Sequence, residues 1–448
     1  MSCLSTPLRF LPVLPREVQL STVLKSGQSF RWQRSPIHAT RSPTTAAEED
    51  GEEWSFGWGD RTVVLRQDDQ GIHYRSLYPF KPPHTAYLAD LASDTTRLQL
   101  VDYFQLSTPL APLYEQWSTA DPKFARKIQV DDETDGKLRG IRVLKQDEWE
   151  TLVSFICSAN NNIARITLMC NRLCAQLGDP LPHPSHFSPE TVYSSPFELD
   201  LVSTSPPPPN DLSLYSFPPP SALTDIPKTE SLLRQLGFGY RANFIPTSAL
   251  HLVETAKSLN KTPIEYLKTL RRDRYKEEEA GERLKEVREK LLEFKGVGRK
   301  VADCVMLFGL GWSQVVPVDT HVFQIAIRDY GFPASKTTSL TPLLQDKVSE
   351  HLAKKWKPHG GWCQQVLFFA DLKPASNAGT PSPTKRKEVT YTKIEIKEEQ
   401  EEEEGEGERK KSFEEEVREI MENPGRKRRR VTLLKAEKIE VKEEGEED

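Results

Sequence analysis

The chain has 448 residues, of which 37% are hydrophobic and 28% are charged. This length can bury a sizeable core, but the composition is too polar for one compact unit from end to end. Residues 376–448 hold 17 Lys and Arg against 22 Asp and Glu, which accounts for the whole formal net charge of −5 and leaves the rest neutral. Nucleic-acid binding depends on neutralising phosphates, so any such face on the neutral part must be local.

The cysteine pattern and the hydropathy exclude several classes of protein. The six cysteines form no CxxC pair and lack secreted-type spacing, which argues against a disulfide framework and against a zinc or iron–sulfur site. They are Cys3, Cys157, Cys170, Cys174, Cys304 and Cys363. No apolar run reaches the roughly 18 residues that span a bilayer, and no secretory signal is evident. We expect a soluble protein of a reducing, intracellular compartment, with no membrane partner and no bound metal.

The N-terminal part shows strand patterning. Between Val18 and Tyr78, aromatic and β-branched residues alternate in short runs: SFRW around Phe30, WSFGW from Trp54, then TVVL and, after a DDQG turn, IHYR. The interval 35–53 is mostly small and charged, which indicates a loop between strands.

Beyond about Asp94 the apolar spacing becomes helical. The clearest helix begins near Asp147, a plausible N-cap, and places one apolar stripe on one face. The stripe consists of Trp149, Leu152, Val153 and Ile156. A Pro- and Ser-rich interval, 179–225, is expected to be a flexible insertion, because proline cannot supply a helix interior or a central strand. Helical patterning resumes at Ser231 and continues to near Leu372.

The tail, 375–448, is of low complexity, with runs such as EEEEGEGERKK, and its blocks of like charge predict disorder. One interpretation is a solubilising appendage, and binding of other proteins by the tail is a separate expectation. The basic clusters Lys385–Lys387 and Arg426–Arg430 favour a second interpretation, nuclear import or loose contacts with nucleic acid.

The segment from Glu282 to Leu310 predicts a helix, a Gly-rich hairpin and a second helix. Apolar stripes on both sides are separated by GVG, which is Gly296, Val297 and Gly298. Glycines let a backbone approach closely, and the amides that open the second helix favour a phosphate. An ordinary helical hairpin with a Gly cap would show the same pattern.

Lys300 lies in the first turn of that second helix, where the helix dipole disfavours a cation. The dipole and partial desolvation both favour the neutral, nucleophilic amine, although a phosphate-binding lysine would also be placed there. Further on, the apolar run VVPV at 315–318 precedes Asp319, which is predicted to lie at the start of another helix. Aspartate is a preferred N-cap, so its use as a catalytic carboxylate gains weight only together with Lys300.

The pairing of GVGRKVADC with VPVDTH resembles the helix-hairpin-helix DNA glycosylase superfamily, and lysine at this place resembles its bifunctional members, which cut the base and then the strand. Four further motifs resemble the eukaryotic 8-oxoguanine DNA glycosylases: SGQSFRW, SFICSANNNIARI, LGFGYRA and GWCQQVLFFADL. The likeness runs from about Val13 to Lys373 and leaves out the Pro-rich insertion and the tail. It implies an α+β fold: an N-terminal antiparallel, TBP-like sheet domain with flanking helices at 13–143 and a helical glycosylase domain at 144–373.

The resemblance also assigns roles to residues. Lys300 is the nucleophile and Asp319 the supporting carboxylate. The damaged base is recognised by Gly27, Cys304, Gln364 and Phe368, where the carbonyl of Gly27 would accept the hydrogen that oxidation adds to N7. Contact with the opposite cytosine and wedging of the duplex are assigned to Asn160, Arg165, Tyr240 and Arg241. Contacts with the DNA phosphates are assigned to Gly296, Val297, Gly298 and His321. Cys304 also has the simpler interpretation of a small core residue.

The implied function is excision of 8-oxoguanine paired with cytosine from double-stranded DNA through a Lys Schiff base, followed by a nick through β-elimination. We expect a monomer located in the nucleus on account of the basic clusters, with a mitochondrial form as an alternative. The reaction needs no cofactor beyond a structural monovalent cation that the family hairpin is able to hold. Lys295 departs from the family, which usually has proline there. The alternatives are a glycosylase for other lesions and a non-catalytic DNA-binding module. The branch acting on oxidised pyrimidines usually has a C-terminal four-cysteine cluster, but only Cys363 follows Asp319.

Overall fold

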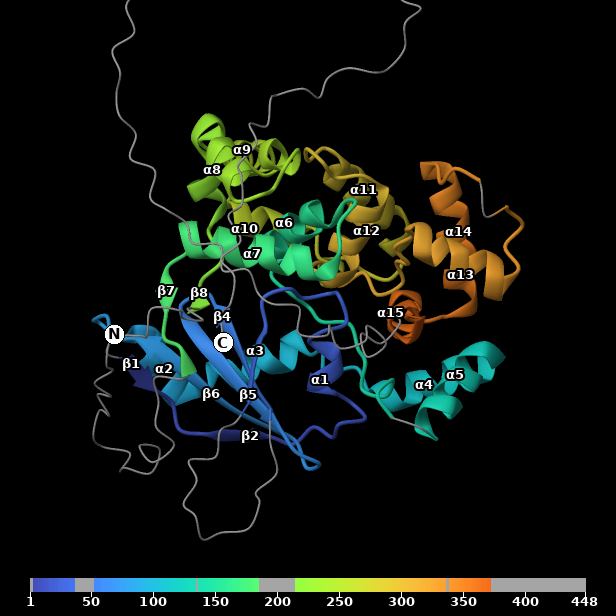
Figure 1. Cartoon of the computed structure of the whole chain (residues 1–448), viewed down its shortest axis with the longest axis horizontal. Coiled ribbons are helices and arrows are strands. Elements are labelled where there is room, and N and C mark those ends of the chain that lie inside the picture. The colour runs from blue at the N-terminus through green and yellow to red at the C-terminus, as the bar shows by residue number, and fades with distance from the viewer. Residues whose placement is uncertain (1–2, 37–51, 134–135, 185–213, 336–337, 372–448) are drawn as a thin grey trace, which may run out of the picture. The chain divides into compact units, whose positions relative to one another are not determined.

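The computed structural model describes residues 3–36, 52–133, 136–184, 214–335 and 338–371 (Figure 1). An antiparallel sheet near the N-terminus is followed by a long helical region, which confirms the predicted α+β fold. Residues 37–51 of the predicted loop and all of the predicted tail at 375–448 lie outside the described residues. Within the described part, no helix is both long and apolar enough to cross a membrane.

The sheet has six strands, all paired in antiparallel fashion. The order is β1-β6-β5-β4-β3, and β2 pairs with β6 as well. The strands are β1 (Cys3–Ser5), β2 (Arg9–Leu11), β3 (Gln33–Pro36), β4 (Glu52–Trp58), β5 (Arg61–Gln67) and β6 (Ile72–Pro79). β1 and β2 precede residue 13, where the predicted domain begins, because three-residue strands are too short to show alternation.

Helices make up most of the rest of the described chain. Those within the first 133 residues are α1 (Leu20–Val23), α2 (Thr85–Ser93), α3 (Thr95–Tyr103), α4 (Leu110–Ala120) and α5 (Pro122–Asp132), of which α4 and α5 contribute to the helical core. Those that follow are α6 (Glu148–Ser158), α7 (Ile163–Leu177), α8 (Ile226–Gln235), α9 (Arg241–Ser258), α10 (Pro263–Thr269), α11 (Ala280–Leu292), α12 (Arg299–Phe308), α13 (Thr320–Tyr330), α14 (Pro342–Lys355) and α15 (Gly360–Asp371). Asp147 caps α6 as predicted, since its carboxylate accepts from the amide of Glu150.

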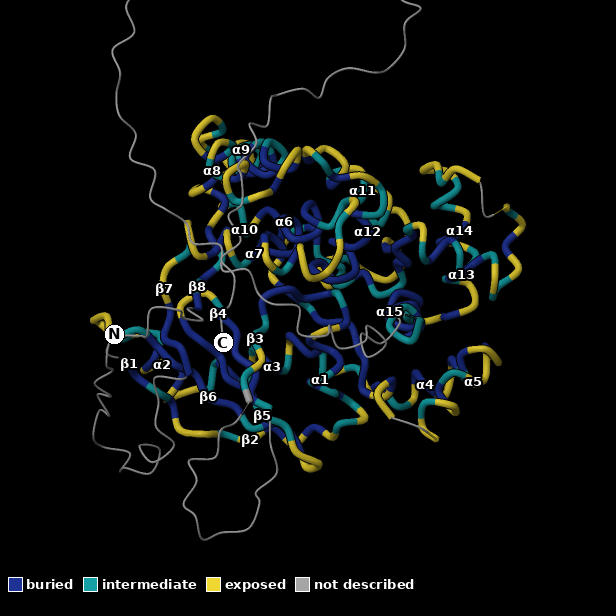
Figure 2. Tube along the Cα trace, viewed as in Figure 1, coloured by how far each residue is buried: buried dark blue, intermediate teal, exposed yellow. Residues whose placement is uncertain are grey.

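Two large hydrophobic cores, with a small third cluster of Leu4, Tyr78 and Tyr87, support the described elements. The sheet packs one core with α1 and α3, and the helical region packs a larger one around α6 and α12, where Figure 2 shows buried tube. Phe30, from the loop before β3, belongs to the helical core and meets Phe155 of α6 edge-on at a ring distance of 5.7 Å. The N-terminal loop is therefore anchored in the helical region.

The Pro- and Ser-rich interval 179–225 is folded at both ends, contrary to the prediction. Short strands β7 (Pro180–Leu181) and β8 (Leu214–Tyr215) pair with each other, and a 3₁₀ turn, η3, covers Pro220–Leu223. A second 3₁₀ turn, η4, lies further on at Arg272–Arg274. Tertiary contacts hold these ends, such as the bond from the Trp149 indole to the Pro218 carbonyl at 3.1 Å. Residues 185–213 lie outside the described residues.

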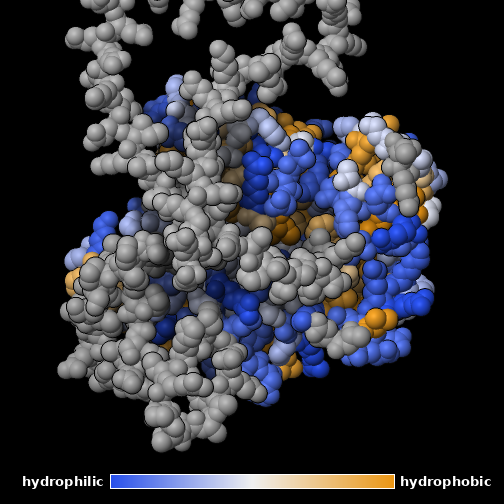
Figure 3. Space-filling view, in the orientation of Figure 1, coloured by the Kyte–Doolittle hydropathy of each residue, from blue (hydrophilic) through white to orange (hydrophobic). Residues whose placement is uncertain are grey.

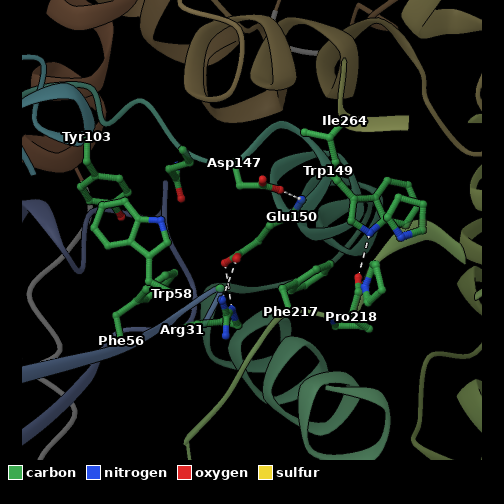
Figure 4. A pocket seen from close by; sticks show the side chains of 14 residues that line it. Arg31, Phe56, Trp58, Tyr103, Asp147, Trp149, Glu150, Phe217, Pro218 and Ile264 are labelled. Atoms are coloured by element: carbon green, nitrogen blue, oxygen red, sulfur yellow. Dashed lines mark hydrogen bonds and ion pairs between the residues drawn. The ribbon is translucent and has the colours of Figure 1, made fainter. Parts of the chain in front are cut away.

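A buried ion pair links the N-terminal loop to α6 beside a cleft of about 250 Å³ (Figure 4). The guanidinium of Arg31 donates to both carboxylate oxygens of Glu150, at 2.9 and 2.7 Å, and to the carbonyls of Gly57 and Tyr215. Burial alone would lower the pKa of Arg31, but the Glu150 carboxylate raises it above its ordinary value. The N-terminal loop, α6, β4 and β8 are thus joined through one cation.

Replacing Glu150 with glutamine should destabilise the fold strongly. The substitution leaves a buried guanidinium without its counter-charge, which costs about 3 kcal/mol or more of unfolding free energy. Chemical denaturation of the two proteins measures the difference. The matched control is Asp132→Asn in the exposed pair with Arg139, where about 1 kcal/mol or less is expected. Equal losses in the two variants would contradict the role given to the buried pair.

Candidate active site

One pocket brings together the predicted nucleophile, the predicted carboxylate and all four residues assigned to the damaged base. Its lining is Gly27, Phe155, Lys300, Cys304, Phe308, Pro317, Asp319, Gln364, Gln365 and Phe368. These residues come from the N-terminal loop, α6, α12, the segment before α13 and α15. The pocket holds about 50 Å³, and because one water needs roughly 10–15 Å³ on this measure, it must widen before a purine can enter.

The Gly-rich hairpin connects α11 to α12 and packs against α9. Gly296 has φ +81°, and a Cβ there would lie 2.3 Å from the Phe244 ring of α9, so no other residue fits. The hydroxyl of Ser248, also on α9, donates to the carbonyl of Lys295 at 3.0 Å. Both contacts fix the hairpin in place and confirm the predicted helix, hairpin and helix.

The start of α12 suits an anion, but not every hairpin residue is placed to contact one. Gly298 is the N-cap, nothing lies within 4 Å of its missing side chain, and no side chain caps the helix. The first amides of α12 therefore have no capping side chain and lie at the positive end of the helix dipole, which suits an anion. Val297 differs, since its side chain is buried and its amide already donates to the Phe294 carbonyl at 3.1 Å. On this surface Figure 3 shows hydrophilic residues over α11, with hydrophobic residues below them toward α15.

Lys300 lies in the first turn of α12, half-buried, with its amine 5.5 Å from the centre of the Phe155 ring. Phe155 in turn stacks on Phe308 at 5.3 Å. Burial lowers the pKa of Lys300, but Cys304 and Asp319 together outweigh it and hold that pKa above its ordinary value. The sequence argument for a neutral amine counted burial and the dipole only; the neighbouring Asp319 carboxylate opposes both and favours the ammonium in the free protein.

Cys304 follows Lys300 by one helical turn and is a core residue that also lines the pocket. Its side chain is buried in the helical core and also lines the pocket beside the amine. Burial raises the pKa of Cys304 to about 12, so the thiol is protonated at neutral pH. A protonated thiol presents a small, polarisable surface to a ligand rather than a charge.

Asp319 is the helix cap that its sequence position allowed, and its carboxylate also lines the pocket. It is the N-cap of α13, and its Oδ1 accepts from the amides of His321 and Val322 at 3.0 and 2.9 Å. The apolar run before it is buried, and the Gln345 amide of α14 holds the Val318 carbonyl at 2.9 Å. The carboxylate is consequently fixed within the pocket that also contains Lys300.

Gly27 lies in a loop that many side-chain bonds restrain. Its φ is +80°, a region that favours glycine. The Gln28 side chain donates to the Arg142 carbonyl and accepts from the Leu144 amide, at 2.9 and 2.8 Å. On the opposite side, the Gln365 amide donates to the Ser26 carbonyl at 2.7 Å. The peptide that would recognise the base is therefore rigid.

α15 contributes Gln364 and Phe368 to the pocket. Phe368 meets the His321 imidazole edge-on at 5.4 Å, and the imidazole Nε2 lies 3.1 Å from the Asp371 carboxylate. His321 thus borders the pocket while being paired with Asp371. Its contact with a DNA phosphate stays a prediction.

The residues predicted for the opposite base lie together at the end of α6. Asn160 has φ +48°, and the Arg241 guanidinium donates to its carbonyl at 3.1 Å and also to that of Ala159. Tyr240 is half-exposed, and its hydroxyl donates to the Ala159 carbonyl at 3.0 Å. Arg165, at the start of α7, reaches the Gly237 carbonyl at 3.3 Å. Arg241 is buried, so it must redirect donors to serve a base.

Sequence reasoning missed several lining or supporting residues. Phe155 and Phe308 were assigned only to motifs and apolar stripes, and Pro317, Gln28 and Gln365 were given no role. The available signal for the two glutamines was their place directly beside Gly27 and Gln364 in the two motifs. Among the described residues, no group of three or more His, Cys, Asp or Glu side chains could hold a metal ion.

Two family models match this chain in succession: "8-oxoguanine DNA glycosylase, N-terminal domain" over residues 10–152 and "HhH-GPD superfamily base excision DNA repair protein" over residues 153–358. The chain is 34% identical over 396 residues to an N-glycosylase/DNA lyase of Saccharomyces cerevisiae, covering 84% of this chain and 90% of that protein. An N-glycosylase/DNA lyase of Arabidopsis thaliana is 32% identical over 361 residues, 80% of this chain and 78% of that one.

The fold is shared with solved structures. The apo form of the Clostridium acetobutylicum 8-oxoguanine glycosylase/lyase superposes with a TM-score of 0.53 at 22% identity, over 82% of this chain and 96% of that one. The same enzyme in complex with double-stranded DNA containing cytosine opposite 8-oxoguanine gives 0.51 at 22% identity, over 79% and 91% of the two chains.

Proposed function

Since this chain belongs to the 8-oxoguanine DNA glycosylase branch of the HhH-GPD superfamily of base-excision repair proteins, we propose that it excises 8-oxoguanine from DNA and then nicks the strand through Lys300. One observation carries the proposal: Lys300 and Asp319 share a pocket with Gly27, Gln364 and Phe368. Neither of the two alternative functions considered from the sequence requires these residues to share one pocket. A DNA-binding module needs no nucleophile, and a glycosylase for other lesions needs no carbonyl at Gly27.

The reaction begins with the damaged nucleotide rotated out of the duplex and its base in the widened pocket. The amine of Lys300 attacks C1′ of the sugar, a C–N bond forms, and the glycosidic bond breaks with its electron pair leaving on the base. The Asp319 carboxylate opposes the positive charge that develops at the sugar. Opening of the sugar ring then gives a protonated Schiff base, from which β-elimination expels the 3′ phosphate.

The raised pKa of Lys300 adds a step before attack. The amine is protonated in the free protein, because Cys304 and Asp319 support the ammonium, and an ammonium is not a nucleophile. The proton must therefore leave as the nucleotide binds. The departing base gains a proton when the glycosidic bond breaks. One proton is thus lost by Lys300 and one is gained by the base, so the number of protons is conserved.

Recognition of the oxidised base rests on its extra N–H. 8-Oxoguanine carries a hydrogen on N7 that guanine lacks, and a backbone carbonyl at Gly27 accepts it, whereas the same carbonyl faces a lone pair of guanine. Gln364 offers an amide for the pairing edge, and Phe368 and Cys304 supply apolar faces. A rigid acceptor discriminates better than a mobile one, because it cannot turn away from the wrong base.

The proposal is tested with purified full-length chain on a duplex that has 8-oxoguanine opposite cytosine. Release of the base, a nick 3′ to the lesion and a covalent complex on adding borohydride are all expected. Duplexes with an alkylated purine or an oxidised pyrimidine serve as comparisons. Activity confined to these other lesions would favour the first alternative, and binding without any trapped complex would favour the second.

Cytosine opposite the lesion should be preferred over adenine. The complex of the Clostridium acetobutylicum enzyme with cytosine opposite 8-oxoguanine supports this, as does the cluster of Asn160, Arg165, Tyr240 and Arg241. Replacing Arg241 with glutamine should narrow the ratio of excision rates opposite the two bases by about tenfold, because a guanidinium fork reads acceptors that adenine does not present. Arg234→Gln, in an exposed pair with Glu230, is the matched control and should leave the ratio intact. An unchanged ratio in the Arg241 variant would rule out its role.

Nuclear residence and protein partners for the tail are part of the same proposal. The basic clusters Lys385–Lys387 and Arg426–Arg430 support nuclear import, although both lie outside the described residues. The chemistry needs no cofactor, since the chain supplies both the nucleophile and the carboxylate. A monomer in solution and a monovalent cation at the hairpin remain predictions that sedimentation and ion titration can check.

A further inference from the structure

Gln365 of α15 is adjacent to the base-recognising Gln364 but is bonded to a different part of the pocket. Its side chain is 3% exposed, and its Nε2 donates to the main-chain carbonyl of Ser26 at 2.7 Å. Ser26 immediately precedes Gly27. The bond thus ties α15 to the N-terminal loop across 339 positions of the sequence.

The neighbouring carbonyls on both sides of Gly27 are held by side-chain amides. Gln365 holds the carbonyl of Ser26 at 2.7 Å, and Gln146 holds that of Gln28 at 2.7 Å through its own Nε2. Gly27 has no side chain to restrain it, and at φ +80° it is otherwise free to turn. The peptides on both sides of Gly27 are therefore held by these amides, in addition to the bonds of the Gln28 side chain.

We propose that Gln365 is a positioning residue for lesion specificity: its bond to Ser26 fixes the Gly27 carbonyl relative to Gln364 on the same helix. The inference rests on the proposed function, since it assumes that Gly27 and Gln364 read opposite parts of one base. Because Gln364 and Gln365 are consecutive, the group that reads the base and the group that holds the loop move as one. A site of this kind depends on geometry held within about half an ångström.

The two steps of the reaction separate this role from a merely structural one. Excision of 8-oxoguanine requires the Gly27 carbonyl to be in place, whereas cleavage at a preformed abasic site has no base to recognise and requires only Lys300 and its surroundings. A change that misdirects Gly27 should therefore slow excision selectively. A change that disturbs α15 or the pocket as a whole should slow both.

The experiment uses full-length Gln365→Met, which keeps the length of the side chain and removes the donor. Single-turnover rates are measured on 8-oxoguanine opposite cytosine and on a preformed abasic site opposite cytosine, with the same preparation. We expect excision to fall about tenfold and abasic-site cleavage to stay within about twofold, as for loss of one buried hydrogen bond at a reading site. The ratio of the two rates does not depend on how much of the preparation is folded.

Two further variants sharpen the result. Gln365→Glu replaces the donor by a carboxylate that repels the Ser26 carbonyl, so its selective loss should exceed that of Gln365→Met. Thr62→Val removes a comparable buried bond, from the Thr62 hydroxyl to the Pro182 carbonyl at 2.6 Å, and should leave the ratio unchanged. Equal loss of both rates in Gln365→Met, or no loss in either, overturns the inference. Absence of 8-oxoguanine excision in the unsubstituted chain would instead overturn the proposed function.

Discussion

Lys300→Gln should abolish the covalent complex that borohydride traps and should lower excision of 8-oxoguanine by roughly a thousandfold or more, since the reaction loses its nucleophile. Glutamine keeps most of the side-chain volume and stays polar beside Phe155, so the pocket is preserved. Because neighbouring groups hold the pKa of Lys300 above its ordinary value, the ammonium stabilises the fold, so Tm should be unchanged or slightly lower. Trapping, single-turnover rates and thermal unfolding measure the three effects.

A lysine elsewhere in the hairpin provides the control. Lys295→Gln removes an exposed ammonium five residues before Lys300 but leaves the pocket untouched. That variant should still be trapped on the lesion duplex, with binding that is weaker only through the loss of one charge near the phosphates. A trapped complex in Lys300→Gln would show that another amine is the nucleophile.

Asp319→Asn should lower excision by about a hundredfold to a thousandfold while leaving the fold nearly as stable as before. The drop follows from losing a preorganised negative charge opposite the developing positive charge at the sugar. Stability should hold because asparagine caps a helix about as well as aspartate, so the bonds from the amides of His321 and Val322 can be kept. Rates and Tm are measured on the same preparation.

The matched control is another N-cap. Asp225 caps α8 through the amide of Lys228 and lies away from the pocket, so Asp225→Asn should alter neither rate nor stability appreciably. If Asp319→Asn were as active as the unsubstituted chain, the carboxylate would be a helix cap and nothing more. The sequence alone left those two interpretations open, and this pair of variants decides between them.

The sequence predicted the elements that carry the catalytic residues because their signals are local. The apolar stripes of α11 and α12, the glycines between them and the capping aspartates at 147 and 319 all act within a few residues of their own position. Family motifs then placed Gly27, Gln364 and Phe368 at the pocket, where the structure has them. β1 and β2, and the folded ends of the interval 179–225, were missed because tertiary contacts rather than local pattern hold them.

The sequence by itself determined the fold class, the helix, hairpin and helix, and which residue types carry the chemistry. Only the tertiary structure decided how they are held and charged. Gln365 meets Ser26, and Arg31 meets Glu150, across stretches of chain that no periodicity spans. The protonation of Lys300 was decided in the same way: burial and the helix dipole can be anticipated from its place in α12, but the opposing effect of Asp319 exists only once another segment is folded against it.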